Sequence, residues 1–481
     1  MRFLENTFEK GVNILEDLLH FLNPNKHRLK GAFMPEYKIL GRRKKGFNLN
    51  GKNIDPKLSM QGVLISGETG SFKTAGVVIR SILTVDGSQI IHDPSKELFE
   101  KTSGALQEKG YQILQLDFSS PKTSLRFNPI IRANTKSEIN RLAHDLVSIG
   151  SDDSSGDDSF WNQKAQEVLY VLITIIKTQE KQYQNLYNIA YLLDLMQSSE
   201  FSKLMDHLFA KDAPNDEIFT KYASIVSQSP NTLSSVLSTA QTAIAIFSLD
   251  DNIAEISSSD TIGDFTNFRR EKTVLYIHSS TSKMRYYSKV TSIFLSQYFE
   301  EFFKELPSDE LLDVYHHLDE LPILSIGSLD IICSNIRKYR GAIMGVTQNA
   351  YAQLSAKYGK RAEAIISNLR TKIFLSADLN TATSLERTSG RYEYFDRQDD
   401  DRLKSRSVLT ADEIMSLPAD RGLIHVSGMR PILARITPYF KVQALRKLTE
   451  LFPYQSPIAP MLEEIPLIPI KEMFASKDET N

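Results

Sequence analysis

The chain has 481 residues, enough for two or three domains, and its 41% hydrophobic and 24% charged residues exclude a largely disordered protein. The formal net charge of −2 does not by itself indicate nucleic-acid binding, although a local basic channel is compatible with it. A single cysteine, Cys333, excludes an intramolecular disulfide, and no apolar run reaches the roughly 18 residues that span a bilayer.

These limits predict a cytoplasmic protein, with peripheral attachment at the inner face of the cell membrane as the alternative. The first 60 residues are expected to form an N-terminal helix and a basic linker. Apolar residues recur at helical spacing between Phe3 and Leu22, and Asn23-Pro24 ends the pattern. A helix packed on the main domain is favoured, and a partner-binding helix is the alternative. The densest basic cluster, Arg42 to Lys45, follows.

A glycine-bearing loop then follows the apolar run Val63-Leu64-Ile65. The order strand, loop, helix is the context in which such a loop binds phosphate, because its backbone N–H groups and the positive end of the helix dipole face the anion. Lys73 is expected to reach the β- and γ-phosphates of ATP, and the Thr74 hydroxyl is expected to bind Mg²⁺. A plain turn between a strand and a helix is the alternative. The predicted nucleotide-binding residues are Gly67, Glu68, Thr69, Gly70, Ser71, Phe72, Lys73 and Thr74.

Phe72 departs from the pattern, since the motif G-x-x-x-x-G-K-[ST] has its second glycine at this position. Glycine lets the backbone approach a phosphate without steric cost. Phe72 is therefore expected to adopt a tolerated backbone angle with its ring turned away from the phosphates.

Strands and helices alternate after the loop, which predicts an α/β fold with a mostly parallel sheet and functional groups at the carboxyl ends of its strands. The helix after Lys73 is expected to reach about Leu83. The next elements are a strand at Gln89–His92, a helix from Lys96 to about Glu108 and a strand at Tyr111–Leu116.

An acidic low-complexity linker, Ser151–Asp158, interrupts this alternation. From Phe160 to about Phe247 nearly every segment has a helical pattern. We expect residues 158–264 to form an all-α insertion that splits a nucleotide-binding domain made of residues 61–157 and 265–445.

Alternation resumes after the insertion. The expected elements are a strand at Val274–Ile277, a helix from Met284 to about Leu306, a strand over Leu312–Glu320, a helix to Lys338, a strand at Ala342–Thr347, a helix at Arg361–Leu369 and a strand at Lys372–Leu375. The charged stretch Tyr392–Ser405 is expected to be a mobile loop, and Gly422–Tyr439 to be rich in strands. Residues 446–481 are interpreted as a proline-containing tail, poorly ordered after Phe452.

Two acids follow one of these strands. Asp319 is predicted to hold Mg²⁺ through water, and Glu320 to polarise the attacking water. A solvated acidic turn is the alternative. The preceding His316 and His317 point to opposite faces of the strand, so they cannot bind one ion together, and a structural role is expected for both.

Gln348 and Arg337 complete the predicted catalytic set with Lys73 and Glu320. Gln348 follows a neighbouring strand, where a polar side chain can sense the γ-phosphate. Arg337 is predicted to act on the nucleotide of an adjacent subunit as an arginine finger. Taken singly, each is more often an ordinary surface residue.

Together these segments resemble the coupling ATPases of type IV secretion and conjugation (the TraG type), over about residues 62–439. The resemblance rests on their order along the chain: Gly67–Thr74; Asp93-Pro94-Ser95-Lys96-Glu97; Phe127-Asn128-Pro129; Phe160-Trp161; Ser234–Thr239; Asp319-Glu320-Leu321-Pro322; Gln348; and Leu409–Glu413 before Leu417-Pro418.

The resemblance implies a RecA-like P-loop NTPase domain, with ATP and Mg²⁺ as cofactors. It also implies a homo-oligomer, a hexameric ring at the cytoplasmic face of the membrane. The implied partners are a relaxase–DNA complex or protein substrates, single-stranded or double-stranded DNA held through its backbone, and membrane-embedded components of the secretion channel.

The leading hypothesis is an ATP-hydrolysing coupling protein that drives a relaxase–DNA substrate through such an apparatus. A coupling ATPase for protein cargo alone is the second hypothesis. The third is a nucleotide-binding adaptor with little hydrolysis, which Phe72 keeps open.

Overall fold

Two groups of parallel strands organise the chain, which the computed structural model describes at residues 33–149, 156–197, 216–396 and 402–470. Each group belongs to its own unit of the chain. Unit 1 takes in the described residues up to Asp86 together with Tyr315–Pro322 and Cys333–Leu451. Unit 2 takes in Gly87–Val314, Ile323–Ile332 and the described residues from Phe452 on.

The strands of unit 1 lie in the order β11-β10-β7-β1-β6-β5. The strand β1 (Val63–Ser66) pairs in parallel with β6 (Gly341–Thr347) on one side and with β7 (Thr371–Phe374) on the other. All four residues of β1 are buried, which matches a strand with neighbours on both edges and apolar packing on both faces. At the margin of this sheet, β10 pairs antiparallel with both β7 and β11.

The remaining elements of unit 1 are η2 (Glu36–Lys38), α2 (Pro56–Ser59), the π-helical turn η3 (Lys73–Val78), α3 (Ile79–Thr84), β5 (Val314–Leu318), η8 (Leu321–Ile323), η9 (Ile336–Tyr339), α16 (Ala350–Tyr358), η10 (Gly359–Arg361), α17 (Ala362–Asn368), α18 (Leu379–Ser389), β8 (Arg391–Asp396), β9 (Arg402–Ser407), α19 (Ala411–Met415), β10 (Arg421–Val426), β11 (Ile432–Arg435), η11 (Tyr439–Lys441) and α20 (Gln443–Thr449).

Unit 2 contains three parallel strands in the order β2-β4-β3, at Ser88–Asp93, Thr273–His278 and Gln112–Asp117. Its other elements are α4 (Glu97–Glu108), η4 (Pro121–Thr123), α5 (Pro129–Arg132), α6 (Lys136–Ser148), α7 (Gly156–Ile176), η5 (Lys181–Tyr183), α8 (Leu186–Gln197), α10 (Asp216–Val226), α11 (Pro230–Ile244), α12 (Ile246–Leu249), α13 (Asp251–Ser257), η6 (Phe265–Arg269), η7 (Thr281–Lys283), α14 (Met284–Phe302) and α15 (Leu329–Asn335).

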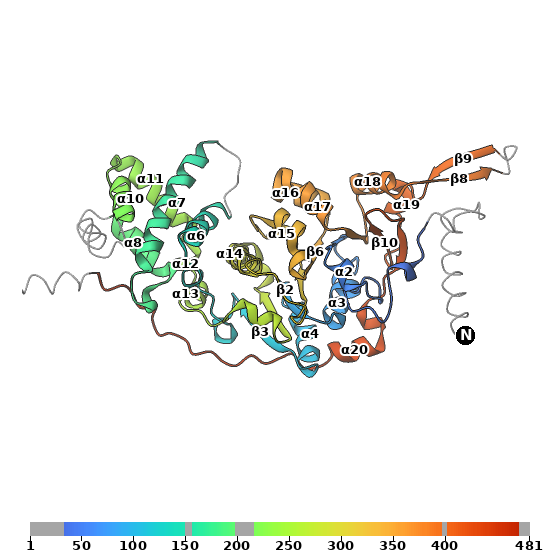
Figure 1. Ribbon diagram of the computed structural model, residues 1–481, viewed down its shortest axis with the longest axis horizontal. Helices are drawn as coiled ribbons and strands as arrows, with labels where there is room; N and C mark the ends of the chain where they lie inside the picture. Colours follow the sequence, from blue (N-terminus) through green and yellow to red (C-terminus); the bar gives the residue numbers. More distant parts are fainter. Residues whose placement is uncertain (1–32, 150–155, 198–215, 397–401, 471–481) are drawn as a thin grey trace, which may run out of the picture. The chain divides into compact units, whose positions relative to one another are not determined.

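The middle of unit 2 is helical, and the described residues between β3 and β4 form no strand. Helix α7 packs against α6, α8, α10 and α11, and these helices lie together in Figure 1. A capping box starts α6, in which Thr135 accepts the Glu138 N–H and the Glu138 carboxylate accepts the Thr135 N–H. The predicted domain limits, including the all-α insertion at 158–264, remain a proposal.

The interpretation of Tyr392–Ser405 as a loop was wrong for residues 392–396 and 402–405, and residues 397–401 lie outside the described ranges. Strands β8 and β9 form an antiparallel hairpin, in which Glu393 pairs with Ser405. Arg391 supports it, with Nε and Nη2 both donating to Ser405 at 3.1 Å. The hairpin extends away from α18 and α19 in Figure 1.

The expectation of a poorly ordered tail after Phe452 was also wrong for residues 452–470. Tyr454 N–H donates to the Ser103 hydroxyl at 3.0 Å, and Leu462 N–H donates to Glu255 Oε1 at 3.2 Å. Ile468 N–H donates to Asn188 Oδ1 at 2.8 Å, and its side chain is only 1% exposed. These contacts fix the segment along unit 2 despite its prolines.

The other differences are smaller. The predicted acidic linker overlaps α7, which begins at Gly156, and α14 ends at Phe302 rather than near Leu306. The helix expected before Lys338 is divided into α15 and η9, and α16 was not predicted. The helix predicted over Phe3–Leu22 lies outside the described residues. None of the helices in the described ranges is long and apolar enough to cross a membrane.

Candidate nucleotide site

Three strand ends meet in register in unit 1. Ser66, the last residue of β1, pairs with Thr347 at the end of β6 and with Phe374 at the end of β7. The residues that follow each strand therefore emerge at one edge of the sheet. This places the loop that starts at Gly67, the side chain of Gln348 and the segment after β7 next to one another.

The loop after β1 needs glycine at two positions. Gly70 has a φ of +85°, where an L side chain is strained. Gly67 has ordinary backbone angles, but a Cβ there would lie 2.5 Å from the Ser71 hydroxyl oxygen and 3.0 Å from the Leu375 Cβ. The Ser71 hydroxyl donates to the Glu68 carbonyl at 2.7 Å and closes the loop.

Phe72 takes the left-handed conformation, with φ 62° and ψ 25°. Its ring packs edge-on against Phe440 of η11, with the ring centroids 6.2 Å apart. The aromatic ring thus stabilises a backbone angle that glycine adopts at low cost. The expectation of an adapted backbone with the ring packed elsewhere agrees with this geometry.

Several backbone N–H groups of the loop donate to no other described residue. Those of Thr69, Gly70 and Phe72 are in this state, whereas Glu68 N–H donates to the Ser376 hydroxyl at 2.6 Å. Glu68, Thr69 and Gly70 are exposed, so the free donors face outward from the strand ends. An anion with several acceptor oxygens satisfies such donors.

Lys73 begins the π-helical turn η3, and its ammonium group lies inside the loop. It donates to the Gly67 carbonyl at 2.5 Å and to the Glu68 carbonyl at 3.0 Å. Burial lowers the pKa of Lys73, while the carboxylates of Glu320, Asp319 and Glu68 act in the opposite direction. Thr74 follows on the same turn and is half-buried. The structure thus brings a cation and two predicted acids into one electrostatic environment.

The two acids follow β5 directly. Asp319 is 9% exposed, and its Oδ1 accepts the Glu320 N–H at 3.2 Å. Glu320 has a φ of 49°, an uncommon angle for a residue that is not glycine. Its Oε1 accepts a hydrogen bond from the Gln348 side-chain amide at 3.4 Å. The sequence-predicted residues Lys73, Asp319, Glu320 and Gln348 therefore converge.

Arg337 does not join this group. It lies on η9, just before the amino end of β6, whereas Gln348 follows the carboxyl end of the same strand. Its side chain is exposed. A seven-residue strand spans about 20 Å, so Arg337 is distant from the loop of its own subunit.

The sequence interpretation missed a set of polar residues beside the loop. They line a hollow of about 190 Å³ together with Ser66, Glu68, Gln348, Ala377 and Thr381. The set comprises Asn349, Gln353, Ser376 and Asp378. Ser376 and Asp378 follow β7, so the rule that placed Gln348 after β6 applies to them once β7 is known to neighbour β1.

The predicted structural role of the two histidines agrees with their contacts. The ring of His316 lies 3.0 Å from the Ala342 carbonyl through Nδ1, and the ring of His317 packs edge-on against Phe47. Burial is the main cause that lowers the pKa of His317, to about 3, so this side chain is neutral at pH 7.

Unit 2 has its own polar cluster at strand ends. Asp117 is the last residue of β3 and pairs with Lys96 at 2.9 Å, and its other oxygen accepts from the Ser119 hydroxyl at 2.6 Å. His278 Nε2 lies 3.4 Å from Asp117. Asp93 accepts the Phe99 N–H at 2.8 Å. Asp93, Asp117 and His278 are each at most 1% exposed, which closes this cluster to a ligand.

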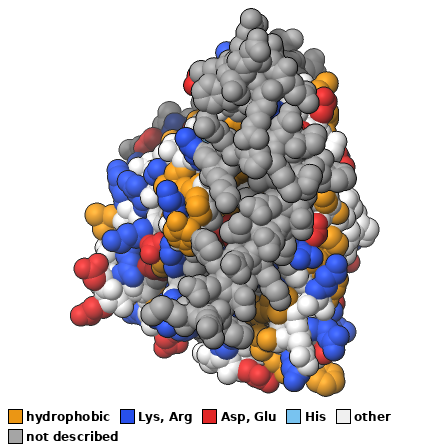
Figure 2. Space-filling view, turned by 90° about the vertical axis from the view of Figure 1, so that its right-hand side faces the viewer, with side chains coloured by type: hydrophobic (Ala, Val, Ile, Leu, Met, Phe, Trp, Pro, Cys, Tyr) orange, Lys and Arg blue, Asp and Glu red, His pale blue; other side chains and the backbone are white. Residues whose placement is uncertain are grey.

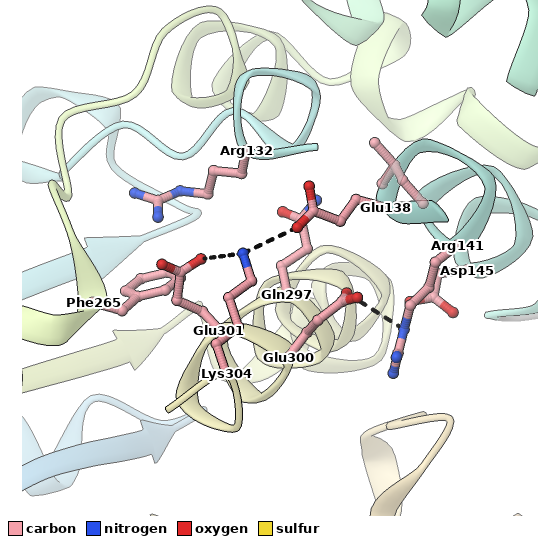
Figure 3. A pocket seen from close by; sticks show the side chains of 10 residues that line it. Arg132, Glu138, Arg141, Asp145, Phe265, Gln297, Glu300, Glu301 and Lys304 are labelled. Atoms are coloured by element: carbon pink, nitrogen blue, oxygen red, sulfur yellow. Dashed lines mark hydrogen bonds and ion pairs between the residues drawn. The ribbon is translucent and has the colours of Figure 1, made fainter. Parts of the chain in front are cut away.

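A second group of charges in unit 2 is also internally paired. Figure 3 shows Lys304 between Glu138, at 3.0 Å, and Glu301, at 3.4 Å, with Arg141 beside Glu300. The hollow that they line measures about 20 Å³. It has room for about one water molecule, so this group joins α6 to α14 rather than holding a nucleotide.

The chain matches the family described as type IV secretory system conjugative DNA transfer over residues 16–456. Among curated proteins, it is 22% identical over 421 residues to the protein VirD4 of Rhizobium radiobacter, covering 80% of this chain and 58% of that protein. The VirD4 protein of Agrobacterium fabrum is likewise 22% identical over 421 residues, with 80% and 60% covered. The chain thus spans about three fifths of the length of these relatives.

Solved structures agree in fold. The plasmid coupling protein TrwB in complex with the GTP analogue GDPNP superposes with a TM-score of 0.66 at 15% identity, covering 87% of this chain and 93% of that one. TrwB in complex with ADP and Mg²⁺ gives a TM-score of 0.61 at 16% identity, with 87% and 92% covered. These likenesses confirm the predicted fold class, an α/β RecA-like P-loop fold with additional helices.

Proposed function

Because the chain belongs to the family of type IV secretory system conjugative DNA transfer proteins, we propose that it is an ATP-hydrolysing coupling protein. The observation that carries this proposal is the convergence of Lys73, Asp319, Glu320 and Gln348 beside a glycine loop with free N–H donors. Structures of the coupling protein TrwB hold nucleotides and Mg²⁺. The donor set of this chain suits the same ligands.

The residues divide the work as follows. The loop N–H groups and the Lys73 ammonium would bind the phosphates, and the Thr74 hydroxyl with Asp319 would hold Mg²⁺. Bound Mg²⁺ neutralises charge on the phosphates. Glu320 would accept the proton of the attacking water, and its hydrogen bond with Gln348 keeps the carboxylate oriented. The Gln348 amide would contact the γ-phosphate, and loss of this contact after hydrolysis would be transmitted to β6.

We further propose a homo-oligomeric ring in the cytoplasm, hexameric as implied by the family resemblance, at the inner face of the membrane. A relaxase–DNA complex or a protein would be the cargo, and membrane-embedded channel components would be the docking partners. Lys, Arg, Asp and Glu side chains are interspersed among the coloured atoms of the face shown in Figure 2. DNA would be held by Lys and Arg side chains through its phosphates, largely independently of sequence.

The decisive experiment is to measure ATP hydrolysis by the pure protein with and without single-stranded DNA. Salt-sensitive stimulation by DNA is expected. Hydrolysis without DNA binding would leave protein as the cargo. ATP binding without turnover would overturn the ATPase proposal in favour of the adaptor, the alternative that Phe72 supports.

We propose that Arg337 acts on the nucleotide of a neighbouring subunit, which its exposed position away from its own loop supports. We expect Arg337→Ala to bind ATP normally and to turn it over about 10³-fold more slowly. Mixed before assembly with excess Lys73→Ala subunits, which still present Arg337, it should regain activity. If Arg337→Ala alone hydrolyses ATP at the parental rate, Arg337 is not an arginine finger but an exposed side chain that contributes little free energy.

A further inference from the structure

Gln348 lies in the turn between β6 and α16, and a residue outside the predicted site, Gln353, forms hydrogen bonds with the backbone of this turn. Gln353 lies on α16, and its single oxygen Oε1 accepts two backbone hydrogen bonds. The Gln348 N–H donates to it at 3.0 Å and the Asn349 N–H at 3.1 Å. These two N–H groups follow the carboxyl end of β6, where the chain turns into the helix.

An ordinary helix cap does not account for this contact. The cap of α16 is Asn349, whose Oδ1 accepts the Ala352 N–H at 3.0 Å. The Ala350 N–H donates to the Ser66 hydroxyl at 3.1 Å. Two of the free donors at the start of the helix are thus satisfied without Gln353. Gln353 instead stabilises the backbone that carries Gln348.

The opposite side of the turn is fixed as well. Asp378, the cap of α18, accepts the Thr381 N–H at 2.9 Å, and hydrogen bonds from Thr381 and Asn349 lower the pKa of its carboxyl. From this turn the Gln348 side-chain amide donates to Glu320 Oε1 at 3.4 Å. Gln353, Gln348 and Glu320 form a continuous chain of hydrogen bonds.

We propose that Gln353 is a positioning residue for ATP hydrolysis, which fixes the backbone of Gln348 so that its amide orients the Glu320 carboxylate. The inference rests on the proposed ATPase function. Misplacing a catalytic group by about 1 Å can cost up to roughly 10²-fold in rate. We therefore expect an effect on turnover without a comparable effect on ATP affinity, because the hydrogen bonds of Gln353 go to the turn after β6 and not to the loop or Lys73.

The test compares three substitutions at one position. Gln353→Met has a similar length but no acceptor, and Gln353→Asn is too short to reach. Both should lower kcat about tenfold with the Kd for ATP unchanged within about twofold. Gln353→Glu retains an oxygen that can accept both N–H groups, and it should restore kcat to within about threefold of the parent.

A double-mutant cycle separates positioning from general stability. Adding Gln353→Met to Gln348→Ala should lower kcat no further, because the residue through which Gln353 acts is already missing. The control is Asp55→Ala, which removes the cap of α2 in the same unit, where Asp55 accepts the Lys57 N–H at 2.9 Å. It should lower the Tm comparably and leave kcat at the parental value.

Amide hydrogen exchange supplies a readout that does not need turnover. Exchange at residues 348 and 349 should accelerate in Gln353→Met and not in Gln353→Glu. Parental kcat in Gln353→Met, or losses that multiply in the double variant, would overturn the inference while leaving the ATPase intact. A parent that binds ATP without hydrolysing it would overturn the proposed function, and this inference with it.

Discussion

The strand ends of the two units use similar residues to opposite effect. Each has a lysine beside carboxylates at the carboxyl ends of parallel strands, Lys73 in unit 1 and Lys96 in unit 2. Each also has a bulky residue in the left-handed conformation, with φ 62° at Phe72 and 65° at Lys96. The position of a polar cluster in the topology therefore does not decide what it does.

The difference lies in how far each cluster is exposed, since Asp93, Asp117 and His278 of unit 2 are at most 1% exposed. In unit 1 the loop residues Glu68 to Gly70 and the side chain of Gln348 are exposed, and loop N–H groups are free. In unit 2 the Asp117 carboxylate is already surrounded by Lys96, His278 and Ser119. The first cluster can bind an anion, whereas the second is a closed structural network.

The largest expected effect in this comparison comes from replacing each of the two lysines separately with alanine. Lys73→Ala removes the cation from the open cluster and should lower ATP turnover by at least about 10²-fold with an unchanged far-UV circular dichroism spectrum. Lys96→Ala should leave turnover intact and destabilise unit 2 instead. Trp161, the only tryptophan, lies on α7 of unit 2 and reports that unfolding by fluorescence. Equal loss of turnover in both would erase the distinction between the clusters.

Substitutions at Asp319 and Glu320, the two acids of the unit 1 cluster, should affect ATP binding and ATP hydrolysis differently. Glu320→Gln should retain Mg·ATP binding and lose roughly 10²-fold or more in kcat, because an amide cannot accept the proton of the attacking water. Asp319→Asn should weaken binding in the presence of Mg²⁺. Isothermal titration with ATP, with and without Mg²⁺, measures binding, and a coupled assay measures kcat. Normal hydrolysis by both variants would place the catalytic carboxylate elsewhere.

The C-terminal segment of unit 2, residues 452–470, contains one buried and one exposed isoleucine that can be compared. Ile468 is 1% exposed and Ile458 is 83% exposed. Ile468→Ala should cost about 2–4 kcal/mol of unfolding free energy, because it leaves a cavity. Ile458→Ala should cost less than about 0.5 kcal/mol. Denaturant titration followed by Trp161 fluorescence compares them, and similar values would mean that the segment does not pack on unit 2 in solution.

The smallest effect is a pH dependence within the closed cluster. Burial is the main cause that raises the pKa of Asp93, to about 6, against opposition from His278. A raised carboxyl pKa means that the folded state resists ionisation, so Asp93 lowers stability as pH rises from about 4 to about 6. The loss is at most about 2–3 kcal/mol.

Asp93→Asn removes this dependence. The stability of the variant relative to the parent should increase between pH 4.5 and pH 7.5, measured by Trp161 fluorescence in urea. Asp117 acts in a different range, since the His278 and Ser119 hydrogen bonds hold its pKa below the usual value. Its contribution is present above about pH 4 and is lost on further acidification. If the difference in unfolding free energy between the parent and Asp93→Asn stays constant from pH 4.5 to pH 7.5, the raised pKa of Asp93 is contradicted.

The sequence was sufficient where local pattern and tertiary role coincide. The strand, loop and helix around Lys73 and the strand before Gln348 were predicted because buried parallel strands are mostly apolar. The strand before Asp319 was predicted despite its two histidines. The hairpin β8–β9 was missed because the charged residues of this stretch are typical of a loop. The C-terminal segment was missed because its order comes from contacts with residues such as Ser103 and Asn188, hundreds of positions away.

The site was predictable only in part for the same reason. Lys73, Asp319, Glu320 and Gln348 each follow a strand, which a linear pattern reveals. Gln353 and Ser376 act through hydrogen bonds to the backbone of Gln348 and Glu68. Ser376 bonds to a residue 308 positions away, so its contribution depends on the strand order. Gln353 bonds to a residue only five positions away, but α16 was not predicted, so this contact was missed with the helix.

The strand order of unit 1 also has a consequence for biosynthesis. Both neighbours of β1, namely β6 and β7, lie far downstream in the chain. A ribosome adds about 5–20 residues per second, so the roughly 275 residues between β1 and β6 take on the order of 15–55 s. Throughout that interval the apolar edge Val63-Leu64-Ile65 has no native partner. We expect the nascent chain to engage chaperones during synthesis, and translation slowed within unit 2 to increase aggregation of this protein.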